Sequence, residues 1–330
     1  MLCAQTTITI LLGILGAILL RKSLLGRRGS DKEQAAVLHC ASCGIAGGGE
    51  IRLNKCDNCD LVKYCSNECQ RDHRSEHEVK CKERAAELRD ELLFRQPESS
   101  HYGDCPICFL PLPLVPDKAT LMSCCSKSIC NGCRIADNIR QWEEKRQHPT
   151  CPFCRHPVPK TREEFFKTLM KRVAVNDPVA LGQMALRHAR REEYDAAFEY
   201  WIKAAELGDA DAHYNLSNMY MKGEGVEKDE KKKIHHLEKA AIRGHPNARV
   251  NLGIYEVRNG RSERAVKHWI IAANLGHDES TNALKACYKD GIVSKEDFAA
   301  ALRGHYAAVA ARKSPQRELA EKSTQSDTKS

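Results

Sequence analysis

The sequence lacks the residue patterns by which most enzymes are recognised. It contains no pair of carboxylates spaced as in a catalytic pocket, no glycine-rich phosphate-binding loop and no Ser-His-Asp set. The common hydrolytic and nucleotide-dependent mechanisms therefore have no candidate residues here. With 330 residues, the chain is long enough for two or three domains.

Cysteine is nearly absent from both ends of the chain. All but two of the 17 cysteines, Cys3 and Cys287, fall between Cys40 and Cys154, mostly in C-x2-C and C-x3-C pairs. This spacing is typical of zinc sites. A disulfide framework is the alternative, but it suits small secreted chains, and about half of this chain is poor in cysteine and helix-like.

Aromatic residues make up only 6% of the chain, and no basic helix is interleaved with them. The formal charge is +8, but four filled zinc sites would carry about −7 and leave about +1. A basic run at Arg21, Lys22, Arg27 and Arg28 contains four of the positive charges. We therefore expect no nucleic-acid partner.

The first 20 residues contain no charged side chain, and Ile8 to Leu20 are almost wholly apolar. A helix of this length rises about 30 Å, enough to cross a membrane. Because the basic run follows the apolar one, the pattern predicts a single-pass anchor with the rest of the chain in the cytosol. A cleaved targeting peptide and a mispredicted start are the alternatives.

A first zinc module is predicted at residues 40–81. Its YCSNECQ and HEVKC stretches and its ligand order resemble the MYND zinc finger. The resemblance implies two interleaved sites, one of Cys40, Cys43, Cys65 and Cys69 and one of Cys56, Cys59, His77 and Cys81. His73 is interpreted as a surface residue. The sequence departs from the family at Arg74, where a tryptophan is usual in the proline-rich peptide groove.

A second zinc module is predicted at residues 101–158, where CPIC and CPFCR resemble the ends of a RING finger. The resemblance implies one site of Cys105, Cys108, Cys130 and Cys133 and a second built on Cys151 and Cys154. Lys127 stands where most RINGs have a histidine, and a protonated lysine cannot bind zinc. Cys124 and Cys125 are the candidates for the two missing ligands. A site with three thiolates, or an empty one, is the alternative.

Further roles follow from the RING resemblance. RING fingers act by docking a ubiquitin-conjugating enzyme and positioning its ubiquitin, which implies Ile107 in the docking patch and Arg155 as a bridging residue. Both residues can also be purely structural. Trp142 is interpreted as a packing residue on a helix from about Arg134 to Lys145.

A helical array is predicted at residues 162–311. The segments KAAELG, KAAIRG and IAANLG recur at 203–208, 239–244 and 271–276, and each follows a helical stretch with large apolar residues. The alanine pairs should let helices approach closely, and each glycine should end its helix in the left-handed conformation. The pattern resembles Sel-one-like repeats, relatives of the tetratricopeptide repeat. About four repeats are expected, with Tyr220, Tyr255 and Trp269 in their core.

The predicted fold is therefore mostly α-helical. It comprises a transmembrane anchor (1–20), a basic linker (21–39), a MYND-like module (40–81), a helical spacer (82–100), a RING-like module (101–158), the repeats (162–311) and a disordered tail (312–330). Two functions remain open. One is a membrane-anchored RING ubiquitin ligase whose repeats recruit a protein substrate. The other is a non-enzymatic scaffold for protein–protein interactions.

Overall fold

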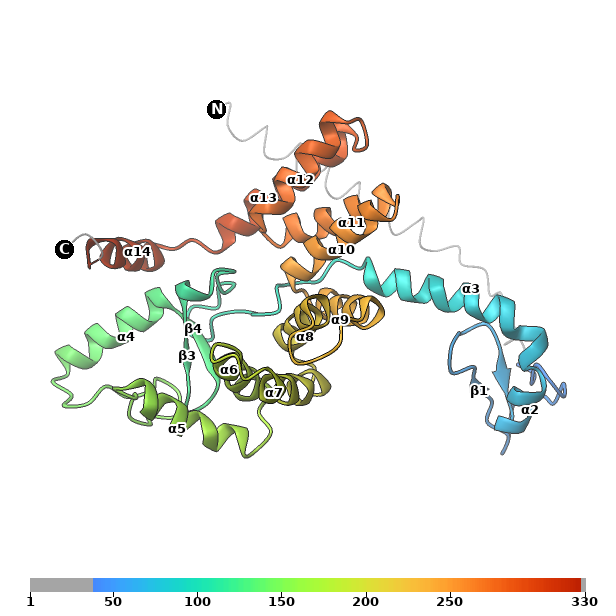
Figure 1. The fold of residues 1–330 in the computed structure, drawn as a ribbon, viewed down its shortest axis with the longest axis horizontal. Helices are drawn as coiled ribbons and strands as arrows, with labels where there is room; N and C mark the ends of the chain where they lie inside the picture. The colour runs from blue at the N-terminus through green and yellow to red at the C-terminus, as the bar shows by residue number, and fades with distance from the viewer. Residues whose placement is uncertain (1–37, 328–330) are drawn as a thin grey trace, which may run out of the picture. The chain divides into compact units, whose positions relative to one another are not determined.

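The computed structural model describes residues 38–327, and residues 1–37 and 328–330 lie outside the described part. The chain divides into two compact units, Met1–Leu88 and Arg89–Ser330. Both are built mainly from helices, with two short β-hairpins (Figure 1). The prediction of a mostly helical chain with cysteine-rich modules and a helical solenoid is thus confirmed.

The first unit is a small module around one hairpin. Strands β1 (Asn54–Lys55) and β2 (Lys63–Tyr64) pair antiparallel, and helix α2 (Asn67–Asp72) follows. The Ser66 side chain caps α2 by accepting a hydrogen bond from the backbone N–H of Cys69. Helix α3 (Arg74–Leu93) begins directly afterwards. Residues 82–93 of the helical spacer predicted at 82–100 are therefore the second half of a longer helix, and residues 94–100 are not helical.

The second unit begins with a compact module around another hairpin. A 3-10 turn, η1 (Pro116–Lys118), leads into β3 (Ala119–Met122), which pairs antiparallel with β4 (Lys127–Cys130). Helix α4 (Asn131–Glu143) follows at once, and Cys130 is its N-cap. Two isolated bridges, Asp104↔Pro111 and Thr150↔Pro157, close the loops that contain the outer cysteine pairs.

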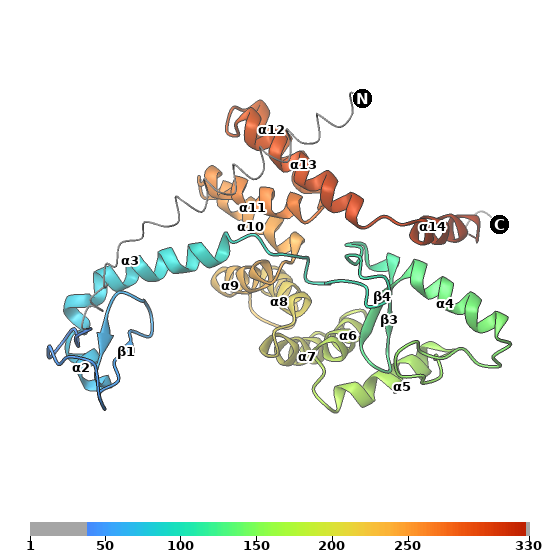
Figure 2. The same ribbon diagram turned by 180° about the vertical axis from the view of Figure 1, so that it is seen from behind.

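The rest of the second unit is an array of helices in which sequence neighbours from α5 to α13 pack together, followed by α14, which packs against α4 (Figures 1 and 2). They are α5 (Arg162–Val173), α6 (Pro178–Ala189), α7 (Tyr194–Glu206), α8 (Ala210–Lys222), α9 (Glu230–Ile242), α10 (Pro246–Arg258), α11 (Ser262–Asn274), α12 (Asp278–Lys289), α13 (Lys295–Ala311) and α14 (Pro315–Asp327).

Local signals account for the helix boundaries of the array. Side chains of Asp177, Asp209 and Asp229 accept hydrogen bonds from backbone N–H groups in the first turns of α6, α8 and α9. The glycines after the alanine pairs have the left-handed conformation, with φ of 87° at Gly208, 83° at Gly244 and 76° at Gly276. The predicted glycine stops are confirmed.

Small residues let the helices of the array approach closely. The three alanine pairs, at 204–205, 240–241 and 272–273, are all buried, and Trp201 and Trp269 fill the spaces between helices. Tyr220 is buried as predicted, whereas Tyr255 is half-buried. The prediction that these aromatic residues form core between repeats is confirmed for Tyr220 and Trp269.

The predicted transmembrane fold needs correction. Among residues 38–327, no helix combines the length and the apolar character that crossing a bilayer requires. Residues 1–20, on which the anchor prediction rested, lie outside the described part of the chain. The same finding on helix length and apolar character contradicts the prediction of a single-pass membrane protein with its modules facing the cytosol.

Two smaller predictions were also wrong, and a third was correct only in part. Residues 315–327 of the expected disordered tail form helix α14, which packs against α4. Trp142, expected to pack, is 80% exposed, because α4 turns the opposite face, with Gly132, Cys133 and Gln141, inward. His73, expected on the surface, is half-buried, because its Nδ1 lies 3.1 Å from the hydroxyl of Tyr64.

Candidate metal centres

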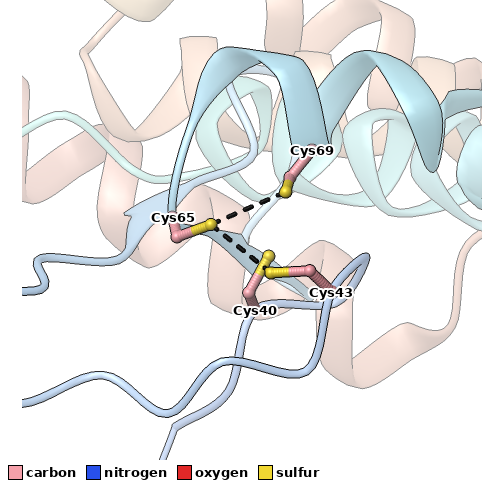
Figure 3. Close-up of side chains that lie close together, drawn as sticks. All are labelled: Cys40, Cys43, Cys65 and Cys69. Carbon is pink, nitrogen blue, oxygen red and sulfur yellow. Dashed lines mark hydrogen bonds between the residues drawn. The ribbon is translucent and has the colours of Figure 1, made fainter.

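The first cluster joins two loops and a helix of the first unit. Cys40 and Cys43 come from the N-terminal loop, Cys65 follows β2, and Cys69 lies on α2 (Figure 3). The Sγ atom of Cys65 is 3.5 Å from that of Cys43 and 3.6 Å from that of Cys69. Four sulfurs bound at about 2.3 Å to one zinc ion lie about 3.8 Å apart, so the spacing fits a tetrahedral metal site.

The second cluster lies between the hairpin and α3. Cys56 and Cys81 have their sulfurs 3.7 Å apart, and Nε2 of His77 lies 3.2 Å from the sulfur of Cys59. His77 and Cys81 share one face of α3 because they are four residues apart. All four residues are buried. The structure thus brings together the ligand sets that the MYND resemblance implied, in the same interleaved order.

Two further clusters interleave in the module around β3 and β4. One contains Cys105, Cys108, Cys130 and Cys133, and the other contains Cys124, Cys125, Cys151 and Cys154. Their shortest sulfur–sulfur distances are 3.9 Å for Cys108–Cys130, 3.8 Å for Cys125–Cys151 and 3.2 Å for Cys124–Cys154. A disulfide would need about 2.05 Å, and every cysteine in the described part of the chain is unbridged.

A tight turn explains how adjacent cysteines reach one centre. Cys124 and Cys125 lie in the turn between β3 and β4, where Ser126 has a left-handed φ of 56°. Lys127, at the position where a RING finger usually has histidine, lies on β4 with its Nζ 4.6 Å from the ring centre of Phe153. The lysine therefore packs on an aromatic face, and Cys124 stands in the cluster instead.

The electrostatics of the clusters favour a bound cation. Burial raises the pKa of Cys40, but backbone hydrogen bonds outweigh it and lower the pKa to about 6. Its neighbour Cys65 has a pKa raised to about 12, chiefly through its contacts with Cys43 and then Cys69. The Cys40 thiol thus ionises readily, whereas ionisation of the Cys65 thiol is disfavoured. A divalent cation removes this conflict, because it stabilises all four thiolates together.

Arg317 of α14 contacts the cluster of Cys105, Cys108, Cys130 and Cys133, which sequence reasoning missed. Its Nη2 lies 3.4 Å from Sγ of Cys108 and donates to the carbonyl of Leu110 at 3.1 Å. Its Nη1 donates to the carbonyls of Pro111, at 2.7 Å, and Arg312, at 2.8 Å. More than 200 residues separate Arg317 from Cys108, so no local pattern could have indicated the contact.

The structure also groups His101, Asp211 and His245. Nε2 of His101 and of His245 lie 3.0 and 3.3 Å from the same carboxylate oxygen of Asp211. Nδ1 of His245 accepts the backbone N–H of Ala248, so its proton is on Nε2 and faces Asp211. Burial raises the pKa of Asp211, but the two histidines outweigh it and hold it well below its usual range. This group is a hydrogen-bonded clamp.

The residues proposed for docking a conjugating enzyme are on the surface. Ile107, between the first two cysteines of its module, is 38% exposed. Arg155 is exposed and has a left-handed φ of 56°, in the turn directly after Cys154.

Comparison with known protein families identifies the first cysteine-rich module and the repeats. The family model described as MYND finger matches residues 40–81, and the model described as Sel1 repeat matches residues 185–209, 210–245 and 246–277. The chain carries a MYND finger and Sel1 repeats. The MYND finger is a zinc-binding module, so this part of the zinc prediction is confirmed. The family models name no RING-type finger.

Parts of two solved structures are similar to part of this chain. A Sel1 repeat protein from Oxalobacter formigenes is 26% identical, with a TM-score of 0.41, over 46% of this chain and 66% of that chain. The protective antigen c5321 from uropathogenic Escherichia coli, which displays an SLR fold, is 25% identical, with a TM-score of 0.37, over 50% of this chain and 37% of that one. The matches therefore span less than two thirds of either protein.

Proposed function

We propose that this chain is a zinc-stabilised scaffold for protein–protein interactions. The observation that supports this most directly is the combination of a MYND finger with Sel1 repeats, since helical repeats of this kind present extended surfaces to protein partners. We further propose that all four clusters hold zinc, because the sulfurs of Cys108 and Cys130, 3.9 Å apart, and of Cys125 and Cys151, 3.8 Å apart, have the spacing of ligands on one zinc ion.

The MYND finger contributes a groove of about 770 Å³ in the first unit. Arg71 and Arg74, both exposed, line it together with Asp57, and Tyr64 beneath is almost fully buried. Lys82 lies in the groove as well but is paired with Glu78 at 2.5 Å. Because arginine replaces the tryptophan that is usual in the family, we propose that this groove prefers acidic peptides over proline-rich ones.

Selection from a random peptide library on the zinc-loaded full chain tests the scaffold proposal. We expect enriched peptides whose binding is lost when the zinc is removed with a chelator. Peptides that occupy the MYND groove should be acidic and should lose binding to the Arg71→Glu, Arg74→Glu chain, whereas Lys82→Ala should have little effect. A library that yields no zinc-dependent binder would refute the scaffold.

A RING-type ubiquitin ligase is the second candidate. It is favoured by the interleaving of two four-cysteine clusters around a hairpin and α4, with Ile107 and Arg155 on the surface beside them. Autoubiquitination of the full chain, measured with a panel of conjugating enzymes, tests it. A ligase should lose chain formation on Ile107→Ala, while the exposed Trp142→Ala serves as a control. If no conjugating enzyme of the panel supported ubiquitin transfer, the ligase would be refuted and the scaffold would be the remaining candidate.

A further inference from the structure

The segment at 89–101, with sequence RDELLFRQPESSH, lies against the repeats although 156 residues separate Leu93 from its contact Arg249. It comprises the last turn of α3 and the extended stretch that follows (Figure 2). Asp90, Leu93 and Phe94 lie on one face, because they are spaced i, i+3 and i+4 and the N–H of Phe94 donates to the carbonyl of Asp90 at 2.8 Å.

Leu93 is the apolar anchor of this contact. Its side chain is 1% exposed and lies among Leu237, Leu252 and three alanines of α9 and α10. Two of the alanines, Ala240 and Ala241, belong to the recurring alanine pair of the repeats. The small side chains that allow close helix packing therefore also form the depression that accepts Leu93.

Two arginines of the repeats contact polar groups of the segment. Arg249, which is fully buried on α10, donates through Nη1 to the main-chain carbonyl of Leu93. Arg264 on α11 donates to both carboxylate oxygens of Asp90, from Nη1 to Oδ2 and, at 2.9 Å, from Nη2 to Oδ1. This fork-to-carboxylate geometry is the strong and specific form of an ion pair. The repeats thus contact a backbone group and an acidic side chain together.

Phe94 completes the face. Its ring centre lies 4.8 Å from that of His268, and the cationic groups of Arg264 and Lys267 lie 4.8 and 5.4 Å from it. Beyond Pro97 the backbone N–H of His101 donates to the carbonyl of Gly244 at 3.2 Å. The segment is therefore bound at both ends, by the acidic and aromatic face first and by the His101 clamp afterwards.

We propose that this face of the repeats is a peptide-binding site that the chain occupies with its own residues 90–101. Partners of the repeats then carry the same pattern, a carboxylate followed three and four positions later by leucine and phenylalanine on one helical face. Side-chain anchors at i, i+3 and i+4 are the recognition mode of helices that bind in grooves. The inference deepens the proposed function, because it specifies what the repeats bind.

Because residues 90–101 occupy the site, they regulate the binding of other peptides to it. A segment tethered beside its own site competes at an effective concentration in the range of about 1 mM. A partner must displace it, so the intact chain binds a matching peptide weakly, and any event that draws residues 90–101 away increases affinity. Because the segment also leads into the module at 101–158, its release changes how that module is held.

Binding of a labelled peptide with the sequence of residues 86–102 to the full chain tests the proposal. The Asp90→Ala, Phe94→Ala chain keeps Leu93 and should fold, while its own segment is weakened. We expect this chain to bind the peptide at least about tenfold more tightly than the original chain does, because the tethered competitor is weaker. Adding Arg264→Glu should abolish the gain, whereas Glu98→Ala, outside the contact face, should behave as the original chain.

Fluorescence anisotropy measures these affinities, and a peptide with Asp90, Leu93 and Phe94 all changed to alanine is the control. Equal binding of both peptides, or no gain in the Asp90→Ala, Phe94→Ala chain, would overturn the inference. A second measurement avoids relying on variants, since excess native peptide should increase amide hydrogen exchange of residues 94–101 in the original chain. If library-selected peptides still bind the chain while this peptide does not, the scaffold stands and only this inference fails.

Discussion

Replacing Arg317 with methionine should weaken metal binding by the cluster of Cys105, Cys108, Cys130 and Cys133. Arg317 is 6% exposed, and its guanidinium group contacts carbonyl oxygens and the sulfur of Cys108. A buried cation needs a negative neighbour, and a zinc ion with four thiolates supplies one because its net charge is −2. The guanidinium and the metal centre therefore stabilise each other.

The size of the effect follows from the kind of contact. A hydrogen bond to a charged group contributes about 1.5–3 kcal/mol, which corresponds to a change of about 10- to 100-fold in an equilibrium constant. The same range is typical when a residue that supports a metal ligand is removed. Methionine retains most of the length and apolar contact of the arginine stem, so the loss should be mainly electrostatic.

Competition between the zinc-loaded full chain and a chelator of known affinity measures the effect, with native mass spectrometry to count the ions. Arg312→Met is the matched control. Arg312 also links the C-terminal segment to this module, donating to the carbonyl of Leu112 at 3.2 Å and of Leu275 at 2.7 Å, but it contacts no thiol. Equal loss of zinc affinity in both variants would show that helix docking alone matters and would refute the charge argument.

Three further predictions concern packing, metal content and pH. Gly253→Ala should destabilise the chain by about 1–3 kcal/mol relative to Gly182→Ala. A Cβ at 253 would lie 2.7 Å from Cε2 of Trp269, whereas one at 182 meets its nearest atom at 3.9 Å. Cys124→Ser should lower the zinc content by one ion per chain. Burial, followed by two neighbouring arginines, lowers the pKa of His268 to about 3, so stability should fall as pH drops from about 6.5 toward 3.

Each of these has a direct readout. Urea unfolding compares the two alanine variants, and a stabilised Gly253→Ala chain would contradict the packing described around Trp269. Native mass spectrometry counts zinc, and an unchanged count in Cys124→Ser would remove this residue from the ligand set. For His268, the unfolded state binds a proton first because its pKa is near 6.5. The His268→Leu chain should therefore lose less stability between pH 7 and pH 5, and an identical loss would argue against a buried neutral histidine.

Local sequence patterns predicted what depends on near neighbours. The glycine at the end of each alanine-pair segment gave the position of a left-handed helix stop, and Gly208, Gly244 and Gly276 all have that conformation. The interleaved order of the clusters was implied by the resemblance to MYND and RING fingers, and the structure groups the cysteines and His77 in that order. The order survives even at Cys124 and Cys125, where the spacing is unusual.

Contacts between distant segments were not predictable in this way. A run of polar residues after Arg312 resembles a disordered tail, but α14 becomes ordered by packing on α4 and by the contacts of Arg317. In the same way, Trp142 follows the helical pattern of a packing residue, yet α4 presents another face to its module. The residues before Pro97 were predicted as a helical spacer, and no local pattern indicated that Leu93 packs among the alanines of the repeats.

The buried arginines also change how the net charge of the chain should be interpreted. A formal charge of +8 suggests a basic surface, but Arg249 and Arg317 are buried and use their guanidinium groups on carbonyl oxygens and a thiol. These cations stabilise contacts within the second unit, between segments more than 150 residues apart. Removing zinc would take away the negatively charged metal centre that Arg317 contacts, so metal loss should loosen α14 before it loosens the repeats, whose own arginine contacts contain no metal ligand.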